Sequence, residues 1–198
     1  GYETENTLAS VEKAIELGVD MIEIDVFQIS SGEIVVFHDE RVDRLSNSAG
    51  NIKEYNIFDL KKLILDGGHR IPMLQEVLKQ INGRVALNIE LKDTKIADNI
   101  HQIIKGYSAK PEWSESQFIV SSFNWEELRK YREYNPEGRI AVLTEGDPLE
   151  AIEVARELNA ESINPHNSQV RAEKVAKMHE GGLNFYTSIV NDQAEFQR

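Results

Sequence analysis

The feature that most constrains the fold of this chain is the alternation of strand-like and helix-like segments along most of its 198 residues. Short runs rich in β-branched residues alternate with longer stretches in which apolar residues recur every three or four positions. This pattern is typical of α/β proteins with a parallel sheet, because a crossover segment must separate consecutive parallel strands. The expected strands are 19–27, 85–92, 118–122, 139–144, 161–164 and 183–190, and the main expected helices are 6–17, 73–81, 96–107, 125–134, 149–158 and 171–179.

Six parallel strands fit either an open doubly wound sheet or part of a barrel. An open sheet usually has a glycine-rich turn after its first strand, and this sequence has none. The pattern also opens and ends on a helix. We therefore expect one domain over residues 1–198, an α/β (β/α)₈ TIM barrel whose first and last strands are missing from this chain.

The run 34–37 follows the first expected strand after a short turn, so the two form an antiparallel hairpin. Residues 39–70 are mostly polar and predict a small insertion after the second barrel strand. One short amphipathic helix is expected within it, around 58–65.

The composition argues against some classes of function. The formal net charge is −12 and no basic stripe is visible, which argues against a nucleic-acid partner. No apolar run is long enough for a transmembrane segment. The absence of cysteine fits a reducing or an oxidising compartment. An enzyme acting on phosphate would need a local positive centre, which a divalent cation supplies.

Two carboxylates stand out in the first strand. Glu23 and Asp25 are two residues apart, so both side chains point to one face while the intervening apolar residues take the other. Inward carboxylates repel each other and are costly to desolvate unless a cation lies between them. The alternative is that they pair with Lys or Arg from a neighbouring strand.

The second parallel strand repeats the pattern, with Asn88, Glu90 and Lys92 on one side. Glu90 can supply a third carboxylate next to the first two, and an all-oxygen set suits Mg²⁺ or Ca²⁺. Lys92 would lie where a phosphate oxygen could reach it. An interstrand Lys–carboxylate pair is again the alternative.

Two histidines lie at the expected carboxyl ends of strands. His38 closes the hairpin near the level of Asp25, on the face where barrel enzymes carry their chemistry, and it is a candidate general acid or base. His166 follows strand 161–164 and is a weaker candidate for substrate contact. Other histidines, at positions 69, 101 and 179, are expected to be solvated.

Short motifs over nearly the whole chain resemble the glycerophosphodiester phosphodiesterase family. They are Glu5-Asn6-Thr7-Leu8, Ile22-Glu23-Ile24-Asp25-Val26, Val35-Val36-Phe37-His38-Asp39, Asp43-Arg44, Ile71-Pro72, Asn88-Ile89-Glu90-Leu91-Lys92, Ser121-Ser122-Phe123 and Val190-Asn191-Asp192. The resemblance implies hydrolysis of glycerophosphodiesters to glycerol 3-phosphate and an alcohol. It implies metal binding by Glu23, Asp25 and Glu90, catalysis by His38, and substrate binding by Lys92.

The chain departs from the family pattern in places. A His-Arg-Gly motif that precedes Glu-Asn-Thr in the family, and carries the second catalytic histidine, is not in this sequence. Thr4 stands where the family usually has proline, and Ser188 where it has an aromatic residue. We expect the chain to be part of a longer protein, because a barrel without two adjacent strands would expose its core.

Two alternatives to this activity stay open. One is a phospholipase-D-like or lysophospholipase-D-like enzyme of the same fold, and the other is an inactive barrel that binds a phosphodiester. The short insertion favours a cytoplasmic location. Whether the chain forms a homo-oligomer is not decided by the sequence.

Overall fold

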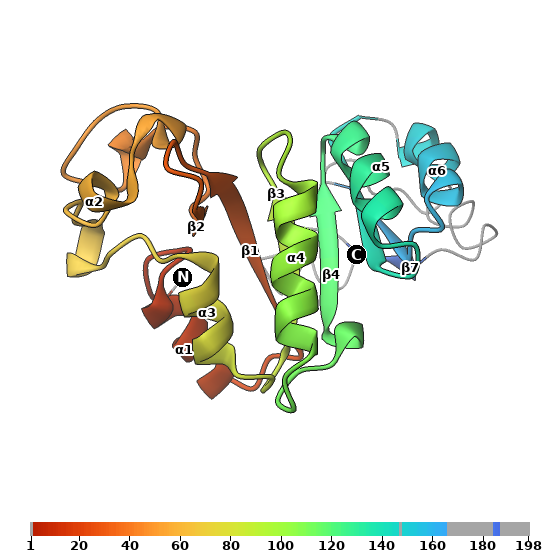
Figure 1. Ribbon diagram of the computed structural model, residues 1–198, viewed down its shortest axis with the longest axis horizontal. Coiled ribbons are helices and arrows are strands. Elements are labelled where there is room, and N and C mark those ends of the chain that lie inside the picture. Colours follow the sequence, from red (N-terminus) through yellow and green to blue (C-terminus); the bar gives the residue numbers. More distant parts are fainter. Residues whose placement is uncertain (1, 147, 166–183, 187–198) are drawn as a thin grey trace, which may run out of the picture.

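The structure is a computed structural model that describes residues 2–146, 148–165 and 184–186. Its framework is a seven-stranded sheet with the order β2-β1-β3-β4-β5-β6-β7 (Figure 1). The strands are β1 (Met21–Gln28), β2 (Ile34–Val36), β3 (Ala86–Leu91), β4 (Phe118–Ser122), β5 (Arg139–Thr144), β6 (Ser162–Pro165) and β7 (Asn184–Phe185). β2 is antiparallel to β1 and every other neighbouring pair is parallel.

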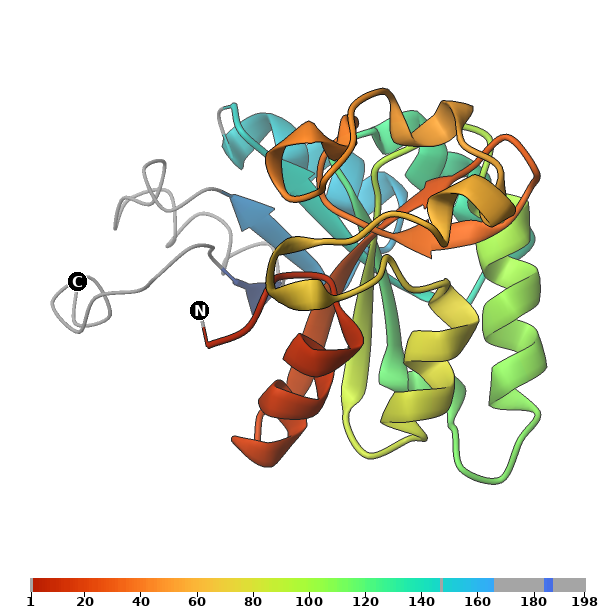
Figure 2. The same cartoon turned by 90° about the vertical axis from the view of Figure 1, so that its left-hand side faces the viewer.

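Helices alternate with the parallel strands as the sequence predicts. They are α1 (Leu8–Glu16), α2 (Ile57–Leu60), α3 (Leu74–Ile81), α4 (Ala97–Ser108), α5 (Trp125–Tyr134) and α6 (Pro148–Glu157). Figure 2 shows α1, α3 and α4 along the outside of the strands. The predicted α/β class with six parallel strands is confirmed. Predicted helix 171–179, His166 and Ser188 lie outside the described residues, as does most of strand 183–190.

The main apolar core lies between the sheet and these helices. On β1 it takes Ile22, Ile24 and Val26, and α1 contributes Val11. Because side chains alternate along a strand, Glu23 and Asp25 face the other side, toward the concave interior of the sheet. β2 pairs with β1 only from Val26 to Gln28, so the first half of β1 is a sheet edge within the described part of the chain.

The insertion has a core of its own. Its buried apolar residues pack on the hairpin; the cluster comprises Phe27, Ile29, Val35, Phe37, Val42, Ile52, Leu60, Leu63, Leu65 and Ile71. The sequence prediction of a polar, irregular segment missed this cluster, because its apolar residues follow neither the helix nor the strand period.

The predicted helix at 58–65 is wrong in extent, since α2 ends at Leu60. The Arg70 guanidinium donates hydrogen bonds to three successive carbonyl oxygens, those of Lys61, Lys62 and Leu63, at 3.1, 2.8 and 2.8 Å. These carbonyls therefore turn toward Arg70 rather than along a helix axis. Arg70 thus binds the carbonyls that directly follow the helix end from a position seven to nine residues further along the chain, a contact that local periodicity does not reveal.

A buried carboxylate fixes the loop that follows β3. Glu127 of α5 accepts hydrogen bonds from the backbone N–H groups of Lys95, Ile96 and Ala97 at 2.9, 2.8 and 2.8 Å. These N–H groups lie at the start of α4, where a helix has donors without internal partners and attracts negative charge. Glu127 thus caps α4 from a neighbouring helix.

We expect Glu127→Ala to lower the free energy of unfolding by about 3 kcal/mol, because it leaves the buried N–H groups of Ile96 and Ala97, and the more exposed N–H of Lys95, without an acceptor. Urea denaturation followed by circular dichroism measures this. Glu133→Ala, an exposed carboxylate on the same helix, is the matched control and should have little effect. Equal losses in the two variants would contradict the capping role.

Candidate metal centre

Three carboxylates converge on the concave side of the sheet. The parallel register pairs Asp25 with Glu90 and Glu23 with Asn88 across β1 and β3. One carboxylate oxygen from each of Glu23, Asp25 and Glu90 lies within 4.8 Å of the other two. The structure therefore brings together the three residues that the sequence analysis selected.

Lys92 lies against this acidic cluster. Its ammonium is 3.0 Å from Glu90 Oε1 and 3.5 Å from Asp25 Oδ1. The interstrand Lys–carboxylate pairing that the sequence left open is thus present. One ammonium balances only one of three carboxylates, however, so the cluster keeps an excess of negative charge.

The pKa shifts of the cluster's side chains reflect this excess of negative charge. Removal from water and the charges of Asp25 and Glu90 raise the pKa of Glu23 to about 8. The carboxylate is surrounded by protein on the inner side of the sheet, yet it keeps access to water at the β1 edge, so its desolvation is partial. Burial and the charge of Asp25 also raise the pKa of Glu90. Burial alone would lower the pKa of Lys92, but Glu90 and Asp25 outweigh it and raise that pKa.

The cluster fits a divalent cation. Asp25 Oδ1 and Glu90 Oε1 are buried and accept no hydrogen bond of good geometry, although both contact the Lys92 ammonium. Carboxylate oxygens that lack donors and repel one another are satisfied by a cation. An all-carboxylate donor set is the kind that hard cations such as Mg²⁺ and Ca²⁺ prefer.

His38 lies beside the cluster as the sequence predicts. The Phe37 N–H donates to the Asp25 carbonyl oxygen at 3.0 Å, which holds the end of the hairpin against β1. His38 Nδ1 is 2.6 Å from Asp39 Oδ1, and Arg44 Nε donates to Asp39 Oδ2 at 2.5 Å. The hydrogen bonds from Arg44, with a smaller contribution from His38, lower the pKa of Asp39. An ionised Asp39 favours a proton on Nδ1 and leaves Nε2 available for proton transfer.

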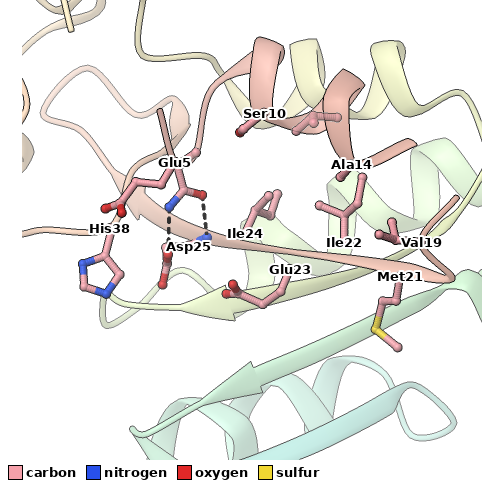
Figure 3. Close-up of a pocket in the computed structure, with 12 residues that line it drawn as sticks. Glu5, Ser10, Ala14, Val19, Met21, Ile22, Glu23, Ile24, Asp25 and His38 are labelled. Carbon is pink, nitrogen blue, oxygen red and sulfur yellow. Dashed lines mark hydrogen bonds between the residues drawn. The ribbon is translucent and has the colours of Figure 1, made fainter. Parts of the chain in front are cut away.

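Two cavities flank the cluster. One, of about 400 Å³, is lined by Glu23, Asp25 and His38 together with residues of the N-terminal segment (Figure 3). The other, of about 550 Å³, is lined by Glu90, Lys92 and the aromatic residues Phe123 and Trp125 at the ends of β3 and β4. Residues of the cluster line both cavities, so the cluster is accessible from two sides.

Sequence reasoning assigned no role to three polar residues of this site. Asn6 hydrogen-bonds Asp25, Asp39 contacts His38, and Asn88 places a buried Oδ1 without a partner beside the cluster. Asp39 could have been selected as the neighbour of His38. Asn6 belongs to the Glu5-Asn6-Thr7-Leu8 motif of the family resemblance, but periodicity gives no reason to pair it with a strand residue 19 positions away.

Sequence and structure comparisons agree on the relatives of this chain. The sequence profile of the glycerophosphoryl diester phosphodiesterase family matches residues 1–198. A glycerophosphodiester phosphodiesterase of Caldanaerobacter subterraneus subsp. tengcongensis is 32% identical over 98% of this chain and 83% of its own. The solved glycerophosphodiester phosphodiesterase of Thermotoga maritima has a TM-score of 0.80 and 26% identity, over 98% of this chain and 84% of its own.

A third relative carries a ligand. The structure of an Oleispira antarctica phosphodiesterase in complex with the product sn-glycerol-3-phosphate has a TM-score of 0.87 and 25% identity, over 96% of this chain and 81% of its own.

The six parallel strands with alternating helices and an acidic centre on one face, together with these relatives, place the chain in the (β/α)₈ TIM-barrel class that the sequence predicts, although the sheet is open within the described residues. The chain belongs to the glycerophosphoryl diester phosphodiesterase family. Within the described ranges, no helix combines the length and the apolar character needed to cross a membrane.

The raised pKa of Glu23 predicts a pH dependence of stability in metal-free protein. The ordinary value of 4.5 applies to the unfolded chain and about 8 to the folded one. Between these values the folded state holds a proton that the unfolded state lacks, so stability falls as the pH rises from about 5 to about 8. Urea midpoints in EDTA should show this fall, and Glu23→Gln should reduce it. Parallel pH profiles for the two proteins would contradict the prediction.

Proposed function

We propose that this chain hydrolyses glycerophosphodiesters to glycerol 3-phosphate and an alcohol, with Mg²⁺ or Ca²⁺ held by Glu23, Asp25 and Glu90. The observation that carries the proposal is the convergence of these three carboxylates within 4.8 Å beside the His38–Asp39 pair. The names of the relatives and the product in the Oleispira antarctica structure support the substrate class.

Each group has a part in this reaction. When bound, the cation polarises the phosphoryl oxygens and offsets the negative charge of substrate and protein. Lys92 would bind the phosphate, because its ammonium lies at the cluster and would be available to a phosphate oxygen once Glu90 ligates a cation. Without this local positive charge, a chain of net charge −12 would repel an anionic diester.

His38 transfers the proton. Water adds to phosphorus, the bond from phosphorus to the alcohol oxygen breaks, and one proton of the water ends on that oxygen. His38 Nε2 is suited to carry a proton in this exchange, because Asp39 holds Nδ1. Asp39 itself is kept ionised by Arg44.

The structure offers little for the lipid-directed alternative. Of the apolar residues in and around α2, Leu60 is buried and Ile57 is half-buried, whereas Phe58 is 79% exposed. Ile64 of the insertion and Phe123 beside the second cavity are also exposed, at 42% and 45%, but these three side chains belong to separate segments, whereas a lipid-binding rim is a contiguous apolar patch. The cytoplasmic location and the oligomeric state stay predictions.

We expect the protein, produced with a His-Arg-Gly segment before Glu5 as in the family pattern, to release glycerol 3-phosphate from glycerophosphocholine with Mg²⁺ or Ca²⁺, and not in EDTA. Glu23→Gln and Glu90→Gln should each lower turnover by about 100-fold or more, because each removes a charged ligand. Glu112→Gln changes an exposed carboxylate before β4 and is the matched control. No release with either metal, or near-normal turnover in both ligand variants, would contradict the proposal.

His38→Gln should lower kcat by about 10²- to 10⁴-fold, the usual contribution of a general acid or base. Its Mg²⁺ affinity, measured by calorimetry without substrate, should stay unchanged, since His38 is not among the proposed ligands. His69→Gln is the control. If His38→Gln lost Mg²⁺ affinity as well as kcat, His38 would be a metal ligand rather than a proton-transfer group.

A further inference from the structure

The N-terminal segment contacts the acidic cluster through Asn6. Asn6 Nδ2 donates to Asp25 Oδ2 at 2.8 Å, and the Asp25 backbone N–H donates to Asn6 Oδ1 at 3.2 Å. The dashed lines at Asp25 in Figure 3 mark this pair of bonds. A carboxylate can only accept and an N–H can only donate, so the two bonds together fix the orientation of the Asn6 amide.

The backbone holds Asn6 in place for this contact. Its φ is +55°, in the left-handed region that asparagine tolerates better than most residues. The Thr7 hydroxyl donates to the Thr4 carbonyl oxygen at 2.8 Å and accepts from the Ser10 N–H at 3.2 Å as the cap of α1. The turn that presents Asn6 is therefore anchored to a helix rather than free to move.

The two carboxylate oxygens of Asp25 have different partners. Oδ2 is held by Asn6, whereas Oδ1 accepts no hydrogen bond of good geometry and lies 3.5 Å from the Lys92 ammonium. Rotation of the carboxylate would break the bond with Asn6. Asn6 therefore determines which oxygen the cluster presents to a cation.

The same turn reaches the His38 side of the site, but more weakly. Glu5 pairs with Arg44, which in turn holds Asp39. About half of the Glu5 and Arg44 side chains is exposed, and exposed pairs contribute little. Asp25, in contrast, is 3% exposed. We therefore expect the contact of Asn6 with the buried Asp25 carboxylate, and not the Glu5–Arg44 pair, to affect the acidic cluster.

We propose that Asn6 is a positioning residue of the metal centre, which orients the Asp25 carboxylate so that Oδ1 faces the cation. This inference rests on the proposed metal centre. Asn6 acts through Asp25, and we assign it no contact with the substrate.

The test is Mn²⁺ binding to metal-free protein, measured by calorimetry without substrate. Asn6→Gly keeps the positive φ and removes the pair of hydrogen bonds to Asp25. We expect the Kd for Mn²⁺ to rise about 10- to 100-fold, as it does when other groups that orient a metal ligand are removed. Asn82→Gly is the matched control: Asn82 is exposed, has φ of +49° and ends α3, away from the cluster. Its Mn²⁺ affinity should equal that of the wild type.

A double-mutant cycle separates positioning from a general loss of structure. If Asn6 acts through Asp25, adding Asn6→Gly to Asp25→Ala, which deletes the acceptor oxygens, should not weaken Mn²⁺ binding further. Asn6→Ser, whose hydroxyl is too short to reach Asp25, replaces the glycine variant if that one does not fold. Unchanged affinity in the folded Asn6 variant, or fully additive effects, would overturn the inference. Absence of Mn²⁺ binding by the wild type would overturn the metal centre itself.

Discussion

The parallel pairing of β1 with β3 is the constraint on which the site depends. It places Asp25 opposite Glu90, so that like charges from two strands meet on the concave side of the sheet. Neither strand can shift to relieve the repulsion, because alternate residues such as Ile24 and Ile89 are fixed in the main core. The apolar core thus holds the carboxylates in an arrangement that a cation stabilises.

Several side chains offset or bind the carboxylates around this strand pair. Lys92 offsets part of the negative charge, and Asn6 binds the one oxygen of Asp25 that faces away from the ammonium. His38 and Arg44 enclose Asp39 at the neighbouring loop. Lys92, Asn6 and the loop with His38 and Arg44 thus supply partners from three separate segments, whereas Asp25 Oδ1, Glu90 Oε1 and Asn88 Oδ1 stay without a hydrogen bond.

Periodicity predicts much of this molecule, since β-strand alternation selects Glu23, Asp25 and Glu90 and the antiparallel hairpin puts His38 beside them. It cannot predict contacts made by side chains far apart in the sequence. Arg70 binds the carbonyls that follow α2, Glu127 caps α4, and Asn6 reaches Asp25 from the other side of a helix. In each case a polar side chain satisfies backbone or carboxylate groups that belong to another element, which leaves no local signal.

The hairpin of β1 and β2 lies between two apolar cores and packs against both. Val26 and Val36 face the main core, whereas Phe27 and Val35 face the core of the insertion. A slip of one residue would exchange the two sets and turn Asp25 toward the helices. Since both cores oppose that slip, surface residues of the insertion can vary widely without loosening the strand that carries Glu23 and Asp25. The outer surface of the insertion can therefore change while the register of the acidic strand next to it stays fixed.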